Sequence, residues 1–187
     1  SKFIILLDDD CLPTNNFIKD YLEDLKKIDT NTILSGVVEY PTNQIRESNY
    51  LQFKSKTHFK IKDVSNKIIK PKNIVAMNMG FLKSDKIMKT NLFDERFTGY
   101  GFEDYEFAFR LKKNNFELKQ TKATIIHDEG IPRFDKYLKK YFHLGRDGMK
   151  NLIMINHEAS LETIYYKIES NFLYKLFLKI PKIILLL

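Results

Sequence analysis

The chain has 187 residues, with 31 Lys and Arg against 24 Asp and Glu, which gives a formal net charge of +7 and an isoelectric point near 9.2. Hydrophobic residues make up 43% and charged residues 29%, close to the globular average, and this composition excludes a disordered or collagen-like chain. The single cysteine, Cys11, excludes a disulfide framework and any Cys-based zinc site. No run of about 18 apolar residues is present, so no complete transmembrane helix is predicted.

Apolar periodicity predicts strands that alternate with helices. In chain order, the expected elements are a buried strand at 3–7, a helix from about 13 to 28, strands at 33–40 and 74–82, a short helix at 84–89, a loop at 98–102, a helix at 103–113, a strand at 116–127 and a helix at 134–143. The loop is expected because Gly99 and Gly101 disfavour both helix and strand. This alternation indicates a layered α/β domain.

Positive charge is concentrated in the last part of the chain. Residues 133–187 carry ten Lys or Arg and five Asp or Glu, and so account for +5 of the net +7. Within 165–182, aromatic and aliphatic residues alternate with lysines. This pattern is typical of an amphipathic segment at an anionic membrane surface, and equally of an amphipathic helix packed on its own domain. Nucleic-acid binding ranks lower, because no nucleic-acid-binding motif accompanies the charge.

Three consecutive acids, Asp8, Asp9 and Asp10, follow the first predicted strand. In open α/β sheets, ligands bind beyond the carboxyl ends of the strands. Neighbouring carboxylates repel one another unless a cation relieves the repulsion, and their oxygens suit Mg²⁺ or Mn²⁺, which usually also hold substrate phosphates. The triplet is therefore a candidate metal site, with a solvated acidic turn before a helix as an equal alternative.

Two later motifs could complete such a site. Gly101, Glu103 and Asp104 stand at the start of the helix expected at 103–113, where acids either stabilise the helix dipole or present a general base to a substrate. His127 ends the strand expected at 116–127. Neutral imidazole is a common ligand of Mn²⁺-like ions, although a lone histidine is more often structural.

In this order and spacing, the motifs resemble the inverting glycosyltransferases of the GT-A fold, most closely family 2. The resemblance covers residues 3 to about 130. The matching pieces are FIILLDDDCLP at 3–13, NMG at 78–80, FDERF at 93–97, GFEDYE at 101–106 with Arg110 and Leu111, and His127. The acid-rich helix start also resembles the carboxyl-terminal segment of animal galactosyltransferases and of bacterial chondroitin-type polymerases.

The resemblance implies a role for each motif. It implies a divalent ion, Mn²⁺ or Mg²⁺, and a DxD motif whose ends are Asp8 and Asp10. By matching position, the metal ligands would be Asp10, His127 and Asp8; the catalytic base would be Asp104, with Glu103 beside it on the acceptor; and the residues facing the donor or acceptor would be Asp8, Asp9, Asn78, Gly80 and Gly101.

The implied protein is a metal-assisted glycosyltransferase of polysaccharide biosynthesis. It would move a sugar from a nucleotide-sugar to a glycan or lipid-linked hydroxyl with inversion. Residues 1–132 would form the catalytic and acceptor-binding part of a partial α/β/α GT-A domain, and residues 133–187 a basic helical tail at the inner, cytoplasmic face of the cell membrane. Family members carry a nucleotide-binding half before the DxD strand, so this chain alone is expected to have an exposed sheet edge and little or no activity.

Two other functions stay open. A metal-dependent phosphotransferase or phosphohydrolase would bring the acids and His127 to one metal without a sugar-sized cleft beside Asp104. A non-catalytic basic module for membranes or polyanions would use the acids only as helix caps, and predicts that Asp10 and His127 lie far apart.

Overall fold

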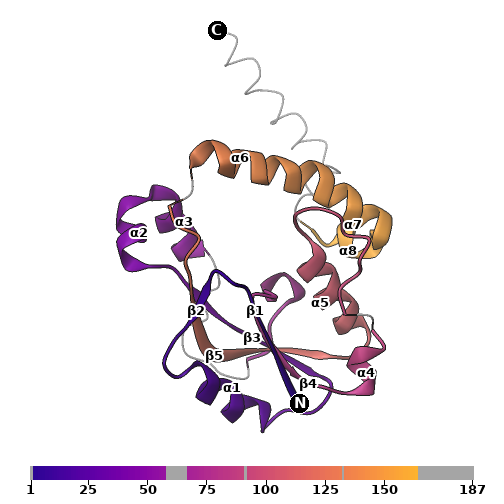
Figure 1. Ribbon diagram of the computed structural model, residues 1–187. Helices are drawn as coiled ribbons and strands as arrows, with labels where there is room; N and C mark the ends of the chain where they lie inside the picture. The colour runs from indigo at the N-terminus through magenta and orange to yellow at the C-terminus, as the bar shows by residue number, and fades with distance from the viewer. Residues whose placement is uncertain (1, 58–66, 91, 132, 164–187) are drawn as a thin grey trace. The chain divides into compact units, whose positions relative to one another are not determined.

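A computed structural model describes residues 2–57, 67–90, 92–131 and 133–163 (Figure 1). The described residues divide into two compact units, one within residues 1–94 and 103–137 and the other within residues 95–102 and 138–187. The basic segment at 165–187, for which a membrane contact is predicted, lies outside the described residues.

The first unit is a mixed α/β fold around one five-stranded sheet. Its strands are β1 (Phe3–Leu7), β2 (Cys11–Pro13), β3 (Thr32–Glu39), β4 (Asn78–Leu82) and β5 (Glu117–His127). Its helices are α1 (Phe17–Leu25), α2 (Thr42–Glu47), α3 (Asn49–Thr57), the 3₁₀ turn η1 (Pro71–Asn73), α4 (Asp85–Met88) and α5 (Glu103–Lys113). The helix α6 (Phe134–His143) begins in this unit and ends in the other.

Strand directions determine which chain segments meet at one end of the sheet. The strand order is β1-β4-β3-β5-β2. β4 is antiparallel to both β1 and β3, and β5 is parallel to β3, so β1, β3 and β5 all run the same way. The carboxyl ends of these three strands and the amino end of β4 therefore share one end of the sheet. Asp8 and His127 come to that end from opposite parts of the chain.

Each face of the sheet is covered by a separate apolar cluster, because side chains alternate along a strand. On one face, α1 contributes Phe17, Tyr21 and Leu25 against sheet residues that include Leu34 and Ile125. On the other face, α5 contributes its buried stripe of Phe107, Ala108 and Leu111 against Ile33, Met79, Phe81 and Leu118. β3 is buried along nearly its whole length, as expected for a strand covered on both faces.

Most sequence-predicted elements of the described chain are confirmed. The strand at 3–7 and the helices at 103–113 and 134–143 have the predicted bounds. The strand predicted at 74–82 begins only at Asn78, because the residues after η1 form a turn. The Asn78 amide closes this turn by donating to the Val75 carbonyl at 3.2 Å. The helix predicted from about 13 to 28 covers only Phe17–Leu25, and Pro13 belongs instead to the strand β2. The helices α2 and α3 had no prediction from the sequence pattern.

A buried asparagine joins the helix α1 to three strands of the sheet. The Asn78 amide nitrogen donates to the Val37 carbonyl at 2.9 Å and to the Ala123 carbonyl at 3.0 Å, and its oxygen accepts the Tyr21 hydroxyl at 2.7 Å. These carbonyls lie where the β3–β5 register shifts between Ser35 and Val37, so the amide supplies the donors that the ladder lacks there. A Cβ at Gly36 would overlap this amide.

Among its described residues, the second unit holds the loop at 95–102 and three further helical segments. These are the π-helical η2 (Leu144–Gly148), α7 (Met149–Ile155) and α8 (His157–Leu161). Gly101 has φ +102°, and a Cβ there would overlap the Leu144 side chain, so this position of the loop requires glycine on two counts. Within the described ranges, every helix is too short or too polar to cross a bilayer.

We predict that Asn78→Ala destabilises the fold strongly. The substitution leaves two buried carbonyls and the Tyr21 hydroxyl without their partner, and together these should reduce the free energy of unfolding by about 3–5 kcal/mol. Urea denaturation monitored by circular dichroism measures the loss. Asn114→Ala is the matched control, because the Asn114 amide is exposed and bonds only to the Arg110 carbonyl of its own helix end. A loss below about 1 kcal/mol for Asn78→Ala would contradict the structural role of this amide.

Candidate active site

The short strand β2 brings the acid triplet against the end of β5. A turn closed by the Cys11 amide on the Asp8 carbonyl, at 3.2 Å, reverses the chain after β1. β2 then pairs antiparallel with β5 so that Cys11 lies opposite His127. The Asp128 amide donates to the Asp10 carbonyl at 2.9 Å and extends this pairing by one bond. Asp10 and His127 are thus adjacent across the β2–β5 ladder, although 117 positions separate them in sequence.

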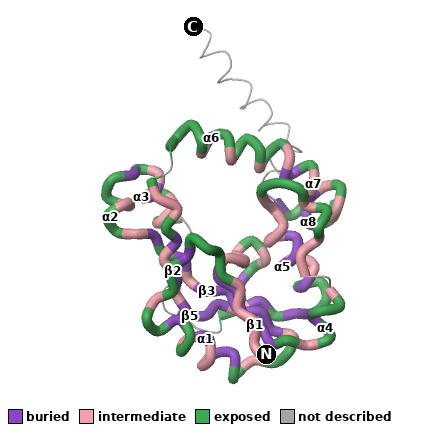
Figure 2. Tube along the Cα trace, in the orientation of Figure 1, coloured by how far each residue is buried: buried purple, intermediate pink, exposed green. Residues whose placement is uncertain are grey.

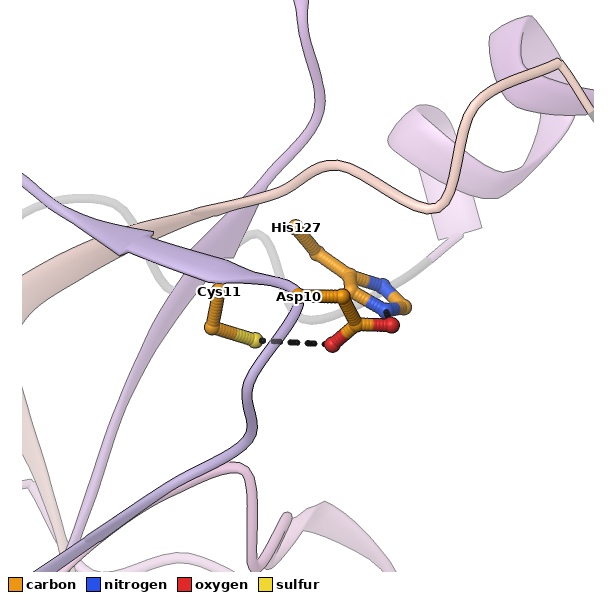
Figure 3. Close-up of side chains that lie close together, drawn as sticks. All are labelled: Asp10, Cys11 and His127. Carbon is orange, nitrogen blue, oxygen red and sulfur yellow. Dashed lines mark hydrogen bonds and ion pairs between the residues drawn. The ribbon is translucent and has the colours of Figure 1, made fainter.

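Three side chains with metal-binding atoms meet at this point (Figure 3). The His127 Nε2 atom lies 3.1 Å from Asp10 Oδ2, and Cys11 Sγ lies 3.6 Å from Asp10 Oδ1. Among the described residues, Asp10, Cys11 and His127 form the group whose ligand atoms all lie within 4.8 Å of one another. If the chain were a non-catalytic module, Asp10 and His127 would be expected to lie far apart. In the structure they lie next to each other.

The Asp10–His127 pair fits a hard or borderline divalent ion. Two neighbouring ligands that each lie ~2.1 Å from an octahedral ion are ~3.0 Å apart, close to the separation of these two atoms. Asp10 is exposed and opens to a ligand, whereas the His127 side chain is only 7% exposed. His127 Nδ1 is buried and has no hydrogen-bond partner among the described residues. The donor set of one carboxylate and one imidazole suits Mn²⁺ better than Mg²⁺.

Cys11 is a site neighbour that sequence reasoning missed. Burial, reinforced by the Asp10 carboxylate, raises the pKa of the Cys11 thiol to about 12, so the thiol is protonated at neutral pH and is a weak ligand. Its side chain is also part of the apolar cluster under α1. The signal that could have revealed it is its position directly after Asp10 in a segment that pairs with β5.

Asp8 interacts electrostatically with both the Asp10–His127 pair and Asp104. Its pKa is raised, first by burial and then by repulsion from Asp10, while His127 lowers it. Asp8 also contributes to raising the pKa of Asp104. It does not belong to the compact group of Asp10, Cys11 and His127, although it was predicted as a metal ligand. Asp9 is exposed beside it.

Asp104 lies in the first turn of α5 and reaches the amino end of β4. Its Oδ2 atom accepts the Ala76 amide at 3.0 Å, two residues before β4 begins. Burial is the main cause that raises the pKa of Asp104 to about 6; the Ala76 hydrogen bond opposes the rise, and the charges of Glu103 and Asp8 add to it. Beside it, Glu103 Oε2 is buried without a hydrogen-bond partner among the described residues.

Arg110 fixes α5 and hence Asp104. Its guanidinium pairs with Glu106 one turn earlier, with Nε to Oε1 at 2.9 Å. It also donates to the carbonyls of Thr90 and Leu92. These contacts make Arg110 an anchor that joins the helix to the turn after α4.

The loop after His127 is fixed by residues from α2 and α3, which the sequence pattern did not reveal. Gln44 donates to the Asp128 carboxylate, and Lys54 Nζ lies 2.7 Å from Glu129 Oε1. Lys54 also lies 5.0 Å above the Tyr40 ring, whose centroid is 5.9 Å from that of His127. These contacts hold the two acids that follow His127 and place the Tyr40 ring beside the His127 ring.

The remaining predicted site residues do not lie at the surface of this cluster. Asn78 and Gly80 are buried in the sheet, and Gly80 faces the Tyr21 ring, where an added Cβ would lie 2.6 Å from a ring carbon. A direct contact between either residue and a substrate would require the sheet to open. Gly101 belongs to the second unit. The described first unit therefore brings together Asp8, Asp10 and His127, and couples Asp104 to Asp8.

Neither a scan against models of known protein families nor a search of curated proteins finds a match to this chain. The resemblance to a glycosyltransferase family consequently depends on the motifs, and the site must be judged by its geometry and chemistry.

We predict that Asp104→Asn stabilises the fold at neutral pH. Because the folded-state pKa of about 6 lies above the ordinary value of 3.8, the folded chain binds this proton more tightly, and stability falls as pH rises from about 4 to about 6. The shift corresponds to about 2–3 kcal/mol. The variant should therefore exceed the wild type by about that amount at pH 7 and lose the advantage below pH 4.

Chemical denaturation at pH 7 and at pH 4 measures this difference. Glu23→Gln is the matched acid-to-amide control and should gain no stability, because its hydrogen bond with Lys122 lowers rather than raises the pKa of Glu23. A stability difference between Asp104→Asn and wild type that is the same at both pH values would refute the assigned burial of this carboxyl group.

Proposed function

We propose that this chain forms the catalytic part of a metal-dependent, inverting glycosyltransferase of the GT-A type, close to family 2. The observation that supports it most is the joint presence, at one end of the sheet, of the Asp10–His127 pair and of Asp104, with Asp8 interacting with both. The motif order of the sequence adds to this support. The donor would be a nucleotide-sugar and the acceptor a hydroxyl of a glycan or lipid-linked glycan.

In the proposed reaction, Asp104 acts as the general base. Its carboxylate takes the proton of the acceptor hydroxyl while that oxygen forms a bond to the anomeric carbon. The bond between the anomeric carbon and the phosphate oxygen breaks on the opposite side, and its electron pair leaves with the nucleoside diphosphate. One displacement inverts the anomeric centre and needs one base. A pKa of about 6 leaves Asp104 mostly ionised at pH 7 and still basic enough to accept a proton.

The acids at the end of β1 would serve the diphosphate. Asp10 and His127 would hold the divalent ion, with Asp8 beside them and Asp9 toward the donor. A bound Mn²⁺ or Mg²⁺ supplies positive charge where negative charge develops on the leaving group. The ion would also relieve the repulsion among the carboxylates that raises the pKa of Asp8.

Glu103 would contact the acceptor beside the base. Its Oε2 atom is buried and has no hydrogen-bond partner among the described residues, so an acceptor hydroxyl would satisfy it. We place the protein in the cytoplasm at the inner face of the cell membrane, on the basis of the basic carboxyl-terminal third and a lipid-linked acceptor.

The test is sugar transfer by the full-length gene product that carries this sequence. Nucleoside diphosphate release and the mass of the glycosylated acceptor are measured over a panel of nucleotide-sugars with Mn²⁺ or Mg²⁺. We expect Asp10→Ala and Asp104→Asn each to lower the rate at least about 100-fold. The wild-type rate should fall below about pH 6, as Asp104 becomes protonated.

Glu23→Gln is again the control and should transfer sugar at the wild-type rate, because it removes only an exposed pair with Lys122. Transfer that persists in both Asp10→Ala and Asp104→Asn would reject the site. Metal-dependent phosphate release from the nucleotide without any glycosylated product would instead support the phosphohydrolase alternative.

A further inference from the structure

The helix α6 carries large apolar residues along one side, and three of them, Phe134, Leu138 and Phe142, are mostly exposed, whereas the Tyr137 ring packs against Tyr50. Its large apolar residues recur at three- and four-residue spacing, so they share one side of the helix. They are Phe134, Tyr137, Leu138, Tyr141 and Phe142. Phe134 is 71%, Leu138 53% and Phe142 61% exposed, and α6 is coloured mainly as exposed in Figure 2. Each such side chain would gain about 2 kcal/mol if it left water.

The opposite side of α6 is basic. At 100° per residue the five apolar side chains occupy an arc of about 140°, and every charged residue falls outside that arc. Residues 133–143 carry Arg133, Lys136, Lys139 and Lys140 against Asp135 alone, a balance of +3. This separation of an aromatic face from a lysine face is typical of helices that lie in the plane of a membrane interface.

The dimensions and the charge of α6 select an anionic lipid surface as its partner. Ten residues of helix are about 15 Å long, half the hydrocarbon thickness, so α6 can lie on a bilayer but not cross it. Phe and Tyr side chains suit the headgroup region, and long lysine side chains at the boundary reach outward to anionic headgroups. A nucleic acid would need cations and stacking aromatics on the same face, whereas here they are on opposite faces.

We propose that α6 is a membrane-contact helix, which inserts Phe134, Leu138 and Phe142 into the interface of an anionic bilayer with Lys136 and Lys139 toward the headgroups. The proposal goes beyond sugar transfer and does not depend on it. It also locates the membrane contact on a described helix, independently of the basic segment at 165–187.

The test is flotation of the 187-residue protein with vesicles of phosphatidylcholine alone or with about 30% phosphatidylglycerol. We expect binding to the anionic vesicles that weakens in high salt, and at least a tenfold loss of the partition coefficient in the triple variant Phe134→Ser, Leu138→Ser, Phe142→Ser. The matched control is Leu12→Ser, Ile18→Ser, Phe53→Ser, which removes three equally exposed apolar side chains elsewhere and should bind like the wild type. Circular dichroism verifies the fold of each variant.

A charge variant separates the two parts of the contact. Lys136→Gln with Lys139→Gln should reduce binding to anionic vesicles several-fold and leave binding to neutral vesicles unchanged, since each lysine near the surface contributes about 1 kcal/mol. Unchanged vesicle binding by the α6 triple variant would overturn the proposal and assign the contact to another part of the chain. The proposal would also be overturned, in favour of self-association, if the wild type did not bind anionic vesicles but formed dimers, and if the triple variant did not dimerise.

Discussion

The three hydrogen bonds of the Asn78 amide are the constraint on which the first unit depends. They satisfy two carbonyls at the point where β3 and β5 lose their regular register, and they tie α1 to the sheet through Tyr21. Beyond this point β5 continues to His127, while Asn78 itself pairs with Leu7, the last residue of β1. The same side chain therefore stabilises both strand ends that bring the acids and the histidine together. A satisfied buried polar group of this kind stabilises the fold and also specifies one strand register.

The candidate site combines groups that destabilise the fold in the absence of a cation. Carboxylates gather where β1 ends, and burial raises the pKa of Asp104 far above its usual range. A fold retains such unfavourable charges when the surrounding structure holds these groups in place. Groups with strongly shifted pKa values are common at catalytic sites. Here the pairing of β2 with β5 holds Asp10 against His127, and Arg110 anchors the helix that carries Asp104.

Much of this arrangement could be predicted from local pattern. The helix at 103–113 has its apolar stripe at Phe107, Ala108 and Leu111, and the strand at 3–7 is a continuous apolar run, so both appear at the predicted positions. The approach of His127 to Asp10 followed from the expectation that ligands gather at the carboxyl ends of strands. The α/β class was predicted correctly, whereas the assignment to the GT-A fold stays a proposal.

The features that could not be predicted from the sequence depend on pairing between segments far apart in the chain. The three-residue strand β2 is too short to show an apolar periodicity, and it forms only because it pairs with β5. The position of Cys11 beside His127 could therefore not be predicted from the sequence. α2 and α3 have mixed polarity, yet Gln44 and Lys54 hold the acids that follow His127. Asn78 and Gly80 lay in a motif that suggested a substrate loop, but burial on β4 becomes apparent only from the sheet order.

The most direct test of the central claim is a crystal structure of the protein grown with Mn²⁺ and a nucleoside diphosphate, with the ion located by its anomalous scattering. We predict one strong peak about 2.1–2.3 Å from both an Asp10 carboxylate oxygen and His127 Nε2, in contact with the diphosphate. The peak should disappear in Asp10→Ala and persist in Asp104→Asn. A diphosphate bound with its ion elsewhere, or an Asp10–His127 pair that stays closed without an ion, would contradict it.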